Sequence, residues 1–543
     1  MRVRHTSEKG LTVQAVAGTF VVLLGFNVPP EMRAGLLGFA VHRNDMTEHE
    51  SRWLPGALTF PGMAAPPYGA STNKFPIQRF RWGDYTAKPN HHYRYRVQAM
   101  YGEPGSLVVG DEVTFEVQTE DPLRVGGGKH QVHFNRSAAA SQAYVRKFGN
   151  SDPQKVPDGQ AFRWLSRGLE ESLIAFIDRA SDASYSLYLC VYEFQKDAFL
   201  AALRRATERN VHVEIIYDAI QGKTGPRASN LEAIERHQLG PYCYPRTMAT
   251  NIFHHKFIVL AQDNVPLAIW TGSTNFTDGA IYGQGNVGHA IEDNELATAY
   301  FQLHQQLLHD PDLNTSRQQV ETLSPQRLVT DILTDQASLY HLFSPRSTLV
   351  ALDTIAELVH NARHLVCFTA PFGLDHKINE VLDDSQTPFL AFGLLNRADN
   401  TMEAMQRTAS DQFVTPARIS TALDTFQVES LHHRGVYIHT KSFVIDPFSA
   451  RPIVVTGSAN FSRNSSLNND ENQLIIVNEP EVTDVYLGEF MRLYDHYQFR
   501  YFLARGETSH LNRNLHTDDS WTDKYFREGL EQRDRLTFSG KLQ

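Results

Sequence analysis

The pattern of hydrophobic and polar positions changes near residue 160. Before that point, short runs such as Tyr93–Ala99 and Val113–Val117 alternate apolar with polar positions, and turns rich in glycine and proline separate them, as at Tyr101–Gly105. A period of two is typical of strands that bury one face. Residues 1–122 are therefore predicted to form an all-β sandwich.

The rest of the chain follows a helix–strand–helix–strand order, and it does so twice. In the first copy, Leu169–Ala180 has apolar positions at helical spacing, and the apolar run Tyr188–Tyr192 indicates a strand. In the second copy, residues 352–359 and 364–369 repeat this order. Such alternation is typical of α/β units with a parallel or mixed sheet. The predicted domains after the sandwich are a linker at 123–159, a first lobe at 160–340 and a second lobe at 341–543.

Two segments near the ends of the chain need separate interpretation. Thr19–Phe26 is apolar, but the residues that follow it include Asn27–Pro30 and no small-residue cleavage site, so we interpret it as a buried strand rather than a signal peptide. No run reaches the roughly 20 apolar residues of a spanning helix, and the expected location is cytoplasmic or peripheral to a membrane. The polar tail from about Arg505 is predicted to wrap the second lobe or to stay mobile.

Composition narrows the class of protein without deciding it. Of the 543 residues, 41% are hydrophobic and 21% are charged, which is ordinary for a globular protein. The formal net charge of −10 argues mildly against non-specific binding to nucleic acid, which favours basic surfaces. Three cysteines form no disulfide framework.

The repeat is sharpest around two groups of polar residues. In the first copy, residues 254–256 read His-His-Lys and residues 271–276 read Thr-Gly-Ser-Thr-Asn-Phe. In the second copy, residues 439–441 read His-Thr-Lys and residues 456–461 read Thr-Gly-Ser-Ala-Asn-Phe. Each matching position is displaced by 185 residues (439 minus 254 for the histidines), with no insertion between the groups. So many shared polar positions inside apolar segments indicate a common function.

The spacing within each motif has a physical reason. Residues i and i+2 of a strand project to the same face, so His254 and Lys256 project together, as do His439 and Lys441. Apolar residues follow each pair, which predicts buried strands. A buried histidine and lysine are costly unless they have partners or a function. The Gly-Ser-x-Asn segment follows a second apolar run, and a turn there would bring serine and asparagine beside the pair.

The combination of His-x-Lys with Gly-Ser-x-Asn resembles the phospholipase D superfamily, over about residues 160–500. The resemblance implies an α/β fold with two lobes related by a pseudo-twofold axis, both motifs meeting at one site. The preceding sandwich is weakly similar to fibronectin type III or immunoglobulin-like modules. The implied site residues are His254, Lys256, Asn275, His439, Lys441, Asn460 and Glu471, with Ser273, Ser458, Asp446 and Asn286 in supporting positions.

The chemistry implied by the family suits these residue types. One histidine attacks phosphorus and forms a phosphohistidine, and the other protonates the leaving oxygen before water completes the reaction. Lys256 and Lys441 would neutralise the non-bridging oxygens, and Asn275 and Asn460 would donate hydrogen bonds to them. The expected activity is that of a phosphoric diester hydrolase that needs no cofactor and no metal. Two motifs in one chain favour a monomer.

The two copies differ at two positions. Asp446 completes the second motif, where the first copy has Ala261. The residue 32 positions after each histidine is Asn286 in the first copy and Glu471 in the second. Because a carboxylate favours the imidazolium form, pairing within each lobe would make His439 the general acid and leave His254, beside a neutral amide, as the nucleophile.

The substrate stays open at this stage. Phospholipid head-group hydrolysis or transphosphatidylation ranks first because of the acidic net charge, and nuclease activity on DNA or RNA is the alternative. A non-catalytic binding scaffold is a remote alternative, because both motifs are intact. Neighbouring histidines, at His254-His255 and His432-His433, point to opposite faces of a strand and predict no metal site.

Overall fold

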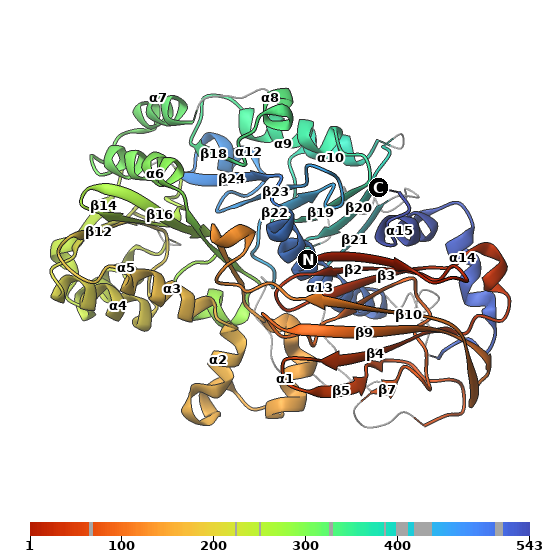
Figure 1. The fold of residues 1–543 in the computed structure, drawn as a ribbon. Coiled ribbons are helices and arrows are strands. Elements are labelled where there is room, and N and C mark those ends of the chain that lie inside the picture. The colour runs from red at the N-terminus through yellow and green to blue at the C-terminus, as the bar shows by residue number, and fades with distance from the viewer. Residues whose placement is uncertain are drawn as a thin grey trace.

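The computed structural model describes residues 1–64, 69–222, 225–248, 251–324, 329–384, 387–397, 411–416, 437–504 and 514–542. Figure 1 shows a β-rich N-terminal part, in red and orange, beside two α/β lobes that run from yellow-green to blue. This arrangement confirms the predicted α/β fold class with an all-β domain in front.

The N-terminal domain consists of two four-stranded sheets, ordered β1-β2-β3-β8 and β10-β9-β4-β5, in which every neighbouring pair is antiparallel. Their inner faces share one core, where Phe26 and Phe39 stack with ring centroids 4.6 Å apart. The apolar run predicted as a strand includes buried β3. The strands are β1 (Arg2–Thr6), β2 (Thr12–Ala17), β3 (Val22–Asn27), β4 (Gly38–Asp45), β5 (Glu50–Trp53), β8 (Arg81–Asp84), β9 (His92–Glu103) and β10 (Ser106–Gln118), with a small pair β6 (Pro55–Gly56) and β7 (Ala70–Ser71).

The first lobe is built on a seven-stranded mixed sheet with the order β11-β17-β16-β15-β12-β13-β14. Helices α3, α4 and α5 pack on one face and α6 on the other, so the central strands are apolar on both sides. The strands are β11 (His130–Phe134), β12 (Tyr185–Val191), β13 (His212–Asp218), β14 (Cys243–Arg246), β15 (Lys256–Gln262), β16 (Val265–Gly272) and β17 (Val287–Glu292). The helices are α3 (Leu169–Asp178), α4 (Asp197–Glu208), α5 (Arg227–Arg236) and α6 (Asn294–Leu307).

The second lobe repeats this topology strand for strand, in the order β18-β24-β23-β22-β19-β20-β21. Its long helix α13 follows β24 just as α6 follows β17, and the repeat predicted from the sequence is thereby confirmed. The strands are β18 (Leu339–Ser344), β19 (Leu365–Thr369), β20 (Leu390–Leu394), β21 (Asp411–Val414), β22 (Ser442–Ile445), β23 (Ile453–Gly457) and β24 (Glu471–Val477). The helices are α9 (Val350–His360), α10 (His376–Leu382), α12 (Arg463–Leu467) and α13 (Pro480–Ala504), and α7 (Leu313–Leu323) and α8 (Val329–Thr334) connect the lobes.

The segment at 123–159, predicted as a linker, contributes directly to the first lobe. Its strand β11 is the edge strand of the lobe sheet and pairs with β17 from His130↔Ile291 to Phe134↔Val287. Helices α1 (Ser141–Phe148) and α2 (Gln160–Ser166) follow and project below the lobe in Figure 1. The sequence pattern did not indicate this strand, because β11 is only five residues long and lies next to a glycine-rich segment.

The C-terminal segment joins the second lobe to the sandwich rather than extending away from either. Trp521 enters the sandwich core and donates from Nε1 to the carbonyl oxygen of Leu36 at 2.8 Å. Arg81 of the sandwich forms ion pairs with Asp495 of α13 and Asp534 of α15, both at 3.1 Å. The helices involved are α14 (Asp523–Phe526) and α15 (Leu530–Phe538), the latter lying between lobe and sandwich in Figure 1.

Because the C-terminal segment packs closely on β3, a larger residue at Gly25 is expected to destabilise the protein. A Cβ atom at Gly25 of β3 would lie well inside van der Waals contact with the backbone carbonyl of Phe538. Gly25→Ala should therefore lower the free energy of unfolding by about 1–3 kcal/mol, because the backbone must shift to relieve the overlap. The urea midpoint of unfolding is the measurement. Gly240→Ala is the control, since nothing lies within 4 Å of its Cβ position, and equal midpoints for the two variants would contradict the prediction.

Candidate active site

Backbone contacts between the lobes place the two motif histidines. Each histidine precedes a central strand, β15 or β22, and is held by the opposite lobe. The amide of His254 donates to the carbonyl of Asp470 at 2.9 Å, and the amide of His439 donates to the carbonyl of Gly285 at 2.8 Å. Short parallel bridges, Phe253↔Asp470 and Gly285↔Ile438, extend these contacts. The site is therefore assembled only when the two lobes meet.

The imidazole rings of His254 and His439 lie next to each other and nearly perpendicular, with ring centroids 6.5 Å apart and an angle of 79° between the ring planes. Both histidines are nearly buried, at 5% and 6% exposure. Lys256 Nζ donates to the carbonyl of His254, and Lys441 Nζ donates to the carbonyl of His439, both at 2.7 Å. The four motif residues predicted from the sequence thus lie around one point between the lobes, with matching local geometry.

Glu471 is the partner of His254. The Nδ1 atom of His254 lies 2.7 Å from Glu471 Oε2. Both groups are buried, and the positive groups around the Glu471 carboxylate lower its pKa despite its burial, so it stays ionised and accepts the hydrogen bond. The side chains of Ser458, Ser465 and Asn469 also donate to this carboxylate. This network holds the ring of His254 with Nε2 as its free nitrogen.

The partners of His439 are neutral. Its Nδ1 atom lies 3.0 Å from the carbonyl oxygen of Ser273 and 3.1 Å from Asn286 Oδ1. The Asn286 amide is oriented by Ser273 Oγ, which donates to Oδ1, and by its own Nδ2, which donates to the carbonyl of Ala280. Both neighbours of Nδ1 are acceptors, so Nδ1 carries a proton and Nε2 is again the free nitrogen.

The pairing expected from the sequence was wrong. Glu471 was expected to contact His439 of its own lobe, and Asn286 to contact His254. In the structure each partner crosses to the other lobe, so the carboxylate belongs to His254 and the amide to His439. The physical reason is the pseudo-twofold arrangement, which places the start of β24 against the first motif and the loop before β17 against the second.

The small residues of the Gly-Ser-x-Asn segments have separate roles. Gly272 and Gly457 have φ of 138° and 144°, and a Cβ at either would overlap the backbone of the adjacent strand. Ser273 and Ser458 orient Asn286 and Glu471, respectively, through their hydroxyls. The serines therefore act as supports for the residues that hold the histidines.

The two asparagines have unequal surroundings. Asn275 Nδ2 donates to Glu193 Oε2 at 2.5 Å, and no such carboxylate contacts Asn460 among the described residues. The Oδ1 atoms of both are buried without a hydrogen-bond partner in the part of the chain that the structure describes. An amide oxygen only accepts, so a hydroxyl or a protonated group could satisfy these two atoms, whereas an anionic phosphodiester oxygen could not.

Asp446 has a structural position. Its carboxylate accepts hydrogen bonds from the backbone amides of Arg363, His364 and Leu365, at 2.7–3.1 Å. The residue itself adopts φ of 45° at the end of β22. It thus holds the turn before β19, and its absence from the first copy, where Ala261 lies inside β15, changes no group at the site.

Burial and mutual repulsion control the protonation of the site. Burial lowers the pKa of His254 to about 4 although Glu471 opposes this, and burial lowers the pKa of Lys256 to about 7. Burial and the neighbouring lysines and His254 lower the pKa of His439 far below its usual range, and burial and Lys256 do the same for the pKa of Lys441. These four groups therefore carry less positive charge than their residue types suggest, and a bound anion would favour their protonation.

Four further residues shape the site and were missed in the sequence. The ring of Tyr192 lies edge-on to His254, with centroids 5.1 Å apart, and Phe372 lies edge-on to His439 at 6.2 Å. Phe372 is 58% exposed. Glu193 contacts Asn275, and Asn135 accepts the backbone N–H of Asn286 at 3.0 Å. The first three follow β12 or β19, the strands beside the motif strands, which is the one sequence signal that could have found them.

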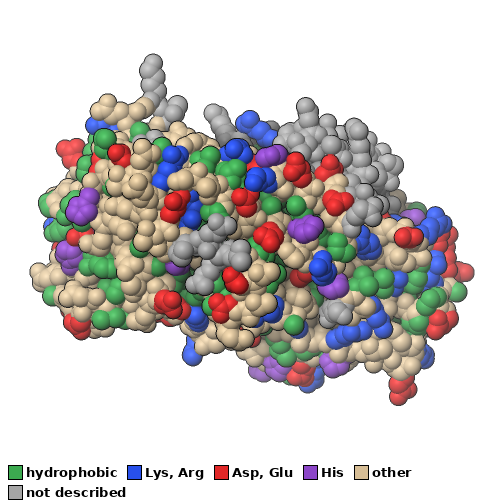
Figure 2. All heavy atoms as spheres, turned by 90° about the horizontal axis from the view of Figure 1, so that it is seen from above, with side chains coloured by type: hydrophobic (Ala, Val, Ile, Leu, Met, Phe, Trp, Pro, Cys, Tyr) green, Lys and Arg blue, Asp and Glu red, His purple; other side chains and the backbone are tan. Residues whose placement is uncertain are grey.

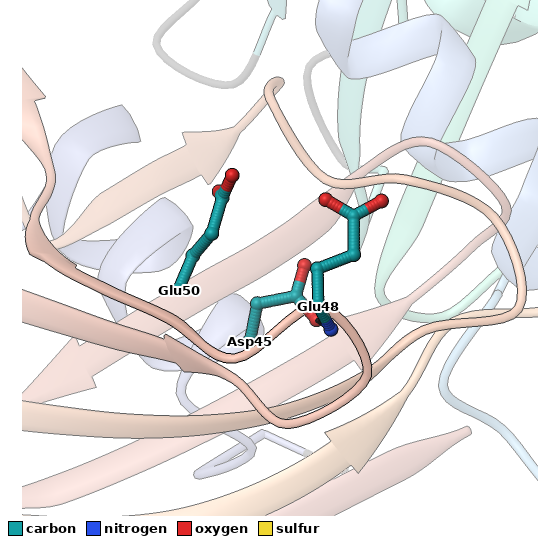
Figure 3. A group of neighbouring side chains, drawn as sticks. All are labelled: Asp45, Glu48 and Glu50. Carbon is teal, nitrogen blue, oxygen red and sulfur yellow. Dashed lines mark hydrogen bonds between the residues drawn. The ribbon is translucent and has the colours of Figure 1, made fainter.

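The acidic cluster of the sandwich does not contribute to this site. Asp45, Glu48 and Glu50 are the one group of potential metal ligands among the described residues, and they lie around the β4–β5 hairpin (Figure 3). Asp45 already accepts from the amides of Thr47 and Glu48 and lies 2.9 Å from His91 Nδ1. His432 and His433 lie outside the described residues. The expectation that the neighbouring histidines form no metal site stays a prediction.

Residues 173–308 and 377–494 match the protein family described as cardiolipin synthase, PLD-like domain. Each matched segment contains one His-x-Lys and one Gly-Ser-x-Asn motif. The chain is therefore a phospholipase D-like protein, with the domain divided between its two lobes, as the motifs indicated. No curated protein matches the sequence significantly.

Several solved structures are similar at low identity. Phosphatidylserine synthase of Haemophilus influenzae Rd KW20 is 12% identical over 69% of this chain and 93% of its own, with a TM-score of 0.42. Polyphosphate kinase of Porphyromonas gingivalis is 11% identical over 56% of this chain and 43% of its own, with a TM-score of 0.40. Nuc of Salmonella typhimurium, a phospholipase D family member, is 17% identical over 30% of this chain and 95% of its own, with a TM-score of 0.23.

Within the described ranges, no helix combines the length and the apolar character that crossing a bilayer requires.

Proposed function

We propose that this chain cleaves phosphodiesters through a covalent phosphohistidine on His254, with His439 as the general acid and then the general base. The supporting observation is the pair of adjacent, nearly perpendicular imidazoles between two lysines. Each has Nδ1 against an acceptor and, among the described residues, Nε2 without a hydrogen-bond partner. Such a pair can attack phosphorus from one side and protonate the leaving oxygen on the other. Lys256 and Lys441 would balance the charge of the non-bridging oxygens.

The crossed partners support this division of roles, for a different reason from the one inferred from the sequence. When neutral His254 attacks through Nε2, its ring becomes positively charged, and the Glu471 carboxylate 2.7 Å from Nδ1 stabilises that charge. His439 instead loses positive charge as it gives up its proton, so neutral acceptors such as Asn286 favour the transfer. Interactions that strengthen in the transition state are those that accelerate the reaction.

The second step would release the covalent intermediate. His439, now neutral, accepts a proton from water or from an alcohol as that molecule attacks the phosphorus bonded to His254. Water yields hydrolysis, and an alcohol yields transfer to a new diester. The residues named so far serve both outcomes equally, so the choice between hydrolysis and transfer depends on which acceptor occupies the site.

A phospholipid is the substrate class that we favour. The matching family is described as cardiolipin synthase, and the net charge of −10 disfavours a long polyanion. On the face shown in Figure 2, acidic and basic side chains are interspersed. Cleavage of DNA or RNA is the second candidate, because the exposed ring of Phe372 beside His439 could stack on a base.

A direct assay distinguishes these possibilities. Pure protein in EDTA would be tested on phosphatidylcholine and phosphatidylethanolamine vesicles, on cardiolipin precursors, and on single- and double-stranded DNA and RNA. We expect head-group release without added metal. His254→Ala and His439→Ala are the active-site controls, and activity that needs a divalent metal or survives both substitutions would refute the proposal.

Anion binding should be accompanied by proton uptake. Burial lowers the pKa of Lys256 to about 7 and lowers the pKa values of His439 and Lys441 well below their usual ranges, so at pH 8 these groups can take up protons. A bound oxyanion raises these pKa values, because it favours the charged form of each group. Tungstate should therefore bind with uptake of about one proton or more at pH 8, and more weakly as the pH rises.

The measurement is titration calorimetry of tungstate binding in Tris and in Pipes, whose ionisation enthalpies differ. The binding heat should differ between the buffers for the wild type. It should differ less for Lys441→Met, which lacks one of the acceptor groups. A buffer-independent heat for the wild type would contradict the prediction.

A further inference from the structure

Glu193 has a carboxylate beside Asn275, one of the residues proposed to bind the phosphate. The proposed reaction gives this carboxylate no role. Glu193 lies two residues after β12, and its Oε2 atom accepts a hydrogen bond from Asn275 Nδ2 at 2.5 Å. The backbone fixes this contact, because the amide of Phe276 donates to the carbonyl of Glu193 at 3.0 Å and Phe194 forms a parallel bridge with Phe276. The carboxylate and Asn275 therefore keep their relative position.

Of the two motif lysines, Lys256 is the one on which the charge of Glu193 acts. The side chain interacts electrostatically with Lys256, which opposes the effect of burial on the Glu193 pKa. On the other side of the pseudo-twofold axis, the corresponding asparagine, Asn460, has no carboxylate partner among the described residues. The Glu471 carboxylate acts on both lysines, and Glu193 adds a further negative charge at Lys256 and Asn275 alone among the two lysine–asparagine pairs.

We propose that Glu193 makes this site select singly charged phosphodiesters over doubly charged phosphomonoesters. The inference rests on the proposed function, since it assigns a specificity to the same phosphate site. A diester presents one negative charge to Lys256 and Asn275, and its esterified oxygens carry none. A monoester at neutral pH presents a second charge, and the adjacent carboxylate repels it. Hydrolysis of a diester by water leaves an alcohol and a monoester, so the same repulsion would speed release of the monoester product.

The test compares Glu193→Gln with the wild type. Glutamine keeps the size of the side chain and an oxygen that can accept from Asn275, and it removes the charge. Two quantities are measured: the KM and kcat for bis(p-nitrophenyl) phosphate, and the inhibition constant of inorganic phosphate at pH 8. We expect phosphate to bind about tenfold tighter or more, the size of effect that one nearby charge has on an ionic equilibrium. The KM for the diester should change by less than about threefold.

Two variants serve as controls. Glu295→Gln removes one negative charge at an exposed position of α6 and should leave both constants unchanged. Glu193→Asp keeps the charge and should retain discrimination against phosphate, which separates a charge effect from a loss of packing. If Glu193→Gln unfolds, Glu193→Asn takes its place with Glu193→Asp as the matched charged variant, and tighter phosphate binding to the asparagine variant than to the aspartate variant is again expected.

The outcomes separate this inference from the proposed function. Suppose that the wild type cleaves the diester. If Glu193→Gln then leaves the inhibition constant of phosphate unchanged, or lowers it and the KM for the diester by the same factor, the inference is wrong and the proposed function stands. If the wild type cleaves no diester, the proposed function fails. Calorimetric binding of phosphate to both proteins needs no turnover, and tighter binding to Glu193→Gln would then still support repulsion of a dianion by Glu193.

Discussion

His254→Ala should abolish the covalent intermediate and lower kcat by about 10⁴-fold or more, because no other imidazole lies opposite His439 among the described residues. The hydroxyls of Ser273 and Ser458 are already engaged with Asn286 and Glu471. The residual rate should come from the lysines and asparagines, which would still bind the phosphate. This is the largest single-residue effect that we expect in the chain.

His439→Ala should behave differently, and the contrast tests the assignment of roles. A substrate with a good leaving group, such as p-nitrophenol, needs little protonation, so His254 should still be phosphorylated. Release of the intermediate needs a base, which the variant lacks. We expect a burst of one p-nitrophenol per protein, followed by turnover reduced by about 10²–10⁴-fold.

The covalent species can be located directly. The burst reaction is stopped in alkaline denaturant, which preserves phosphohistidine, and the phosphorylated peptide is identified by mass spectrometry. The label is expected on His254. His309→Ala, at an exposed position at the end of α6, should leave the kinetics unchanged, whereas a label on His439 would reverse the proposed roles.

Glu471→Gln should reduce kcat by about 10²-fold or more while changing KM little, because the lost interaction is strongest when the His254 ring becomes positively charged. The Glu471 carboxylate is buried and accepts from three side chains besides His254. Glutamine matches its size but cannot accept from all of them, and it can present an amide N–H to His254 Nδ1 instead of an acceptor. The wrong tautomer would then leave Nε2 protonated and unable to attack.

Asn286→Asp is the matched counterpart of this variant. It adds a carboxylate beside His439, which should raise the pKa of His439 from its lowered value. The imidazolium then persists to higher pH, so the alkaline limb of the kcat profile should move upward. Profiles of kcat against pH for both variants, with thermal unfolding as a check on folding, make the comparison. An unchanged alkaline limb in Asn286→Asp, or a wild-type kcat in Glu471→Gln, would show that these partners do not act through the histidines.

Much of the architecture was predictable because it depends on local patterns. Alternating runs such as Tyr93–Ala99 indicated the sandwich, and the constant displacement of 185 residues indicated two lobes. The sequence pattern did not predict elements that are short or that depend on pairing with residues far away in the chain. Strand β11 is five residues long and gains its stability from β17, more than 150 residues away in the chain.

The amino-acid sequence by itself determined which groups form the site: His254, Lys256, His439 and Lys441 are identified by spacing, because alternate residues of a strand share a face. The hydrogen-bond partner of each histidine, in contrast, depends on the tertiary structure. Each histidine takes its partner from the opposite lobe, so Glu471 serves His254 and Asn286 serves His439. The reason is geometric, since a pseudo-twofold axis between two similar sheets brings equivalent loops against each other's motifs, and no local pattern records which lobe a side chain will meet.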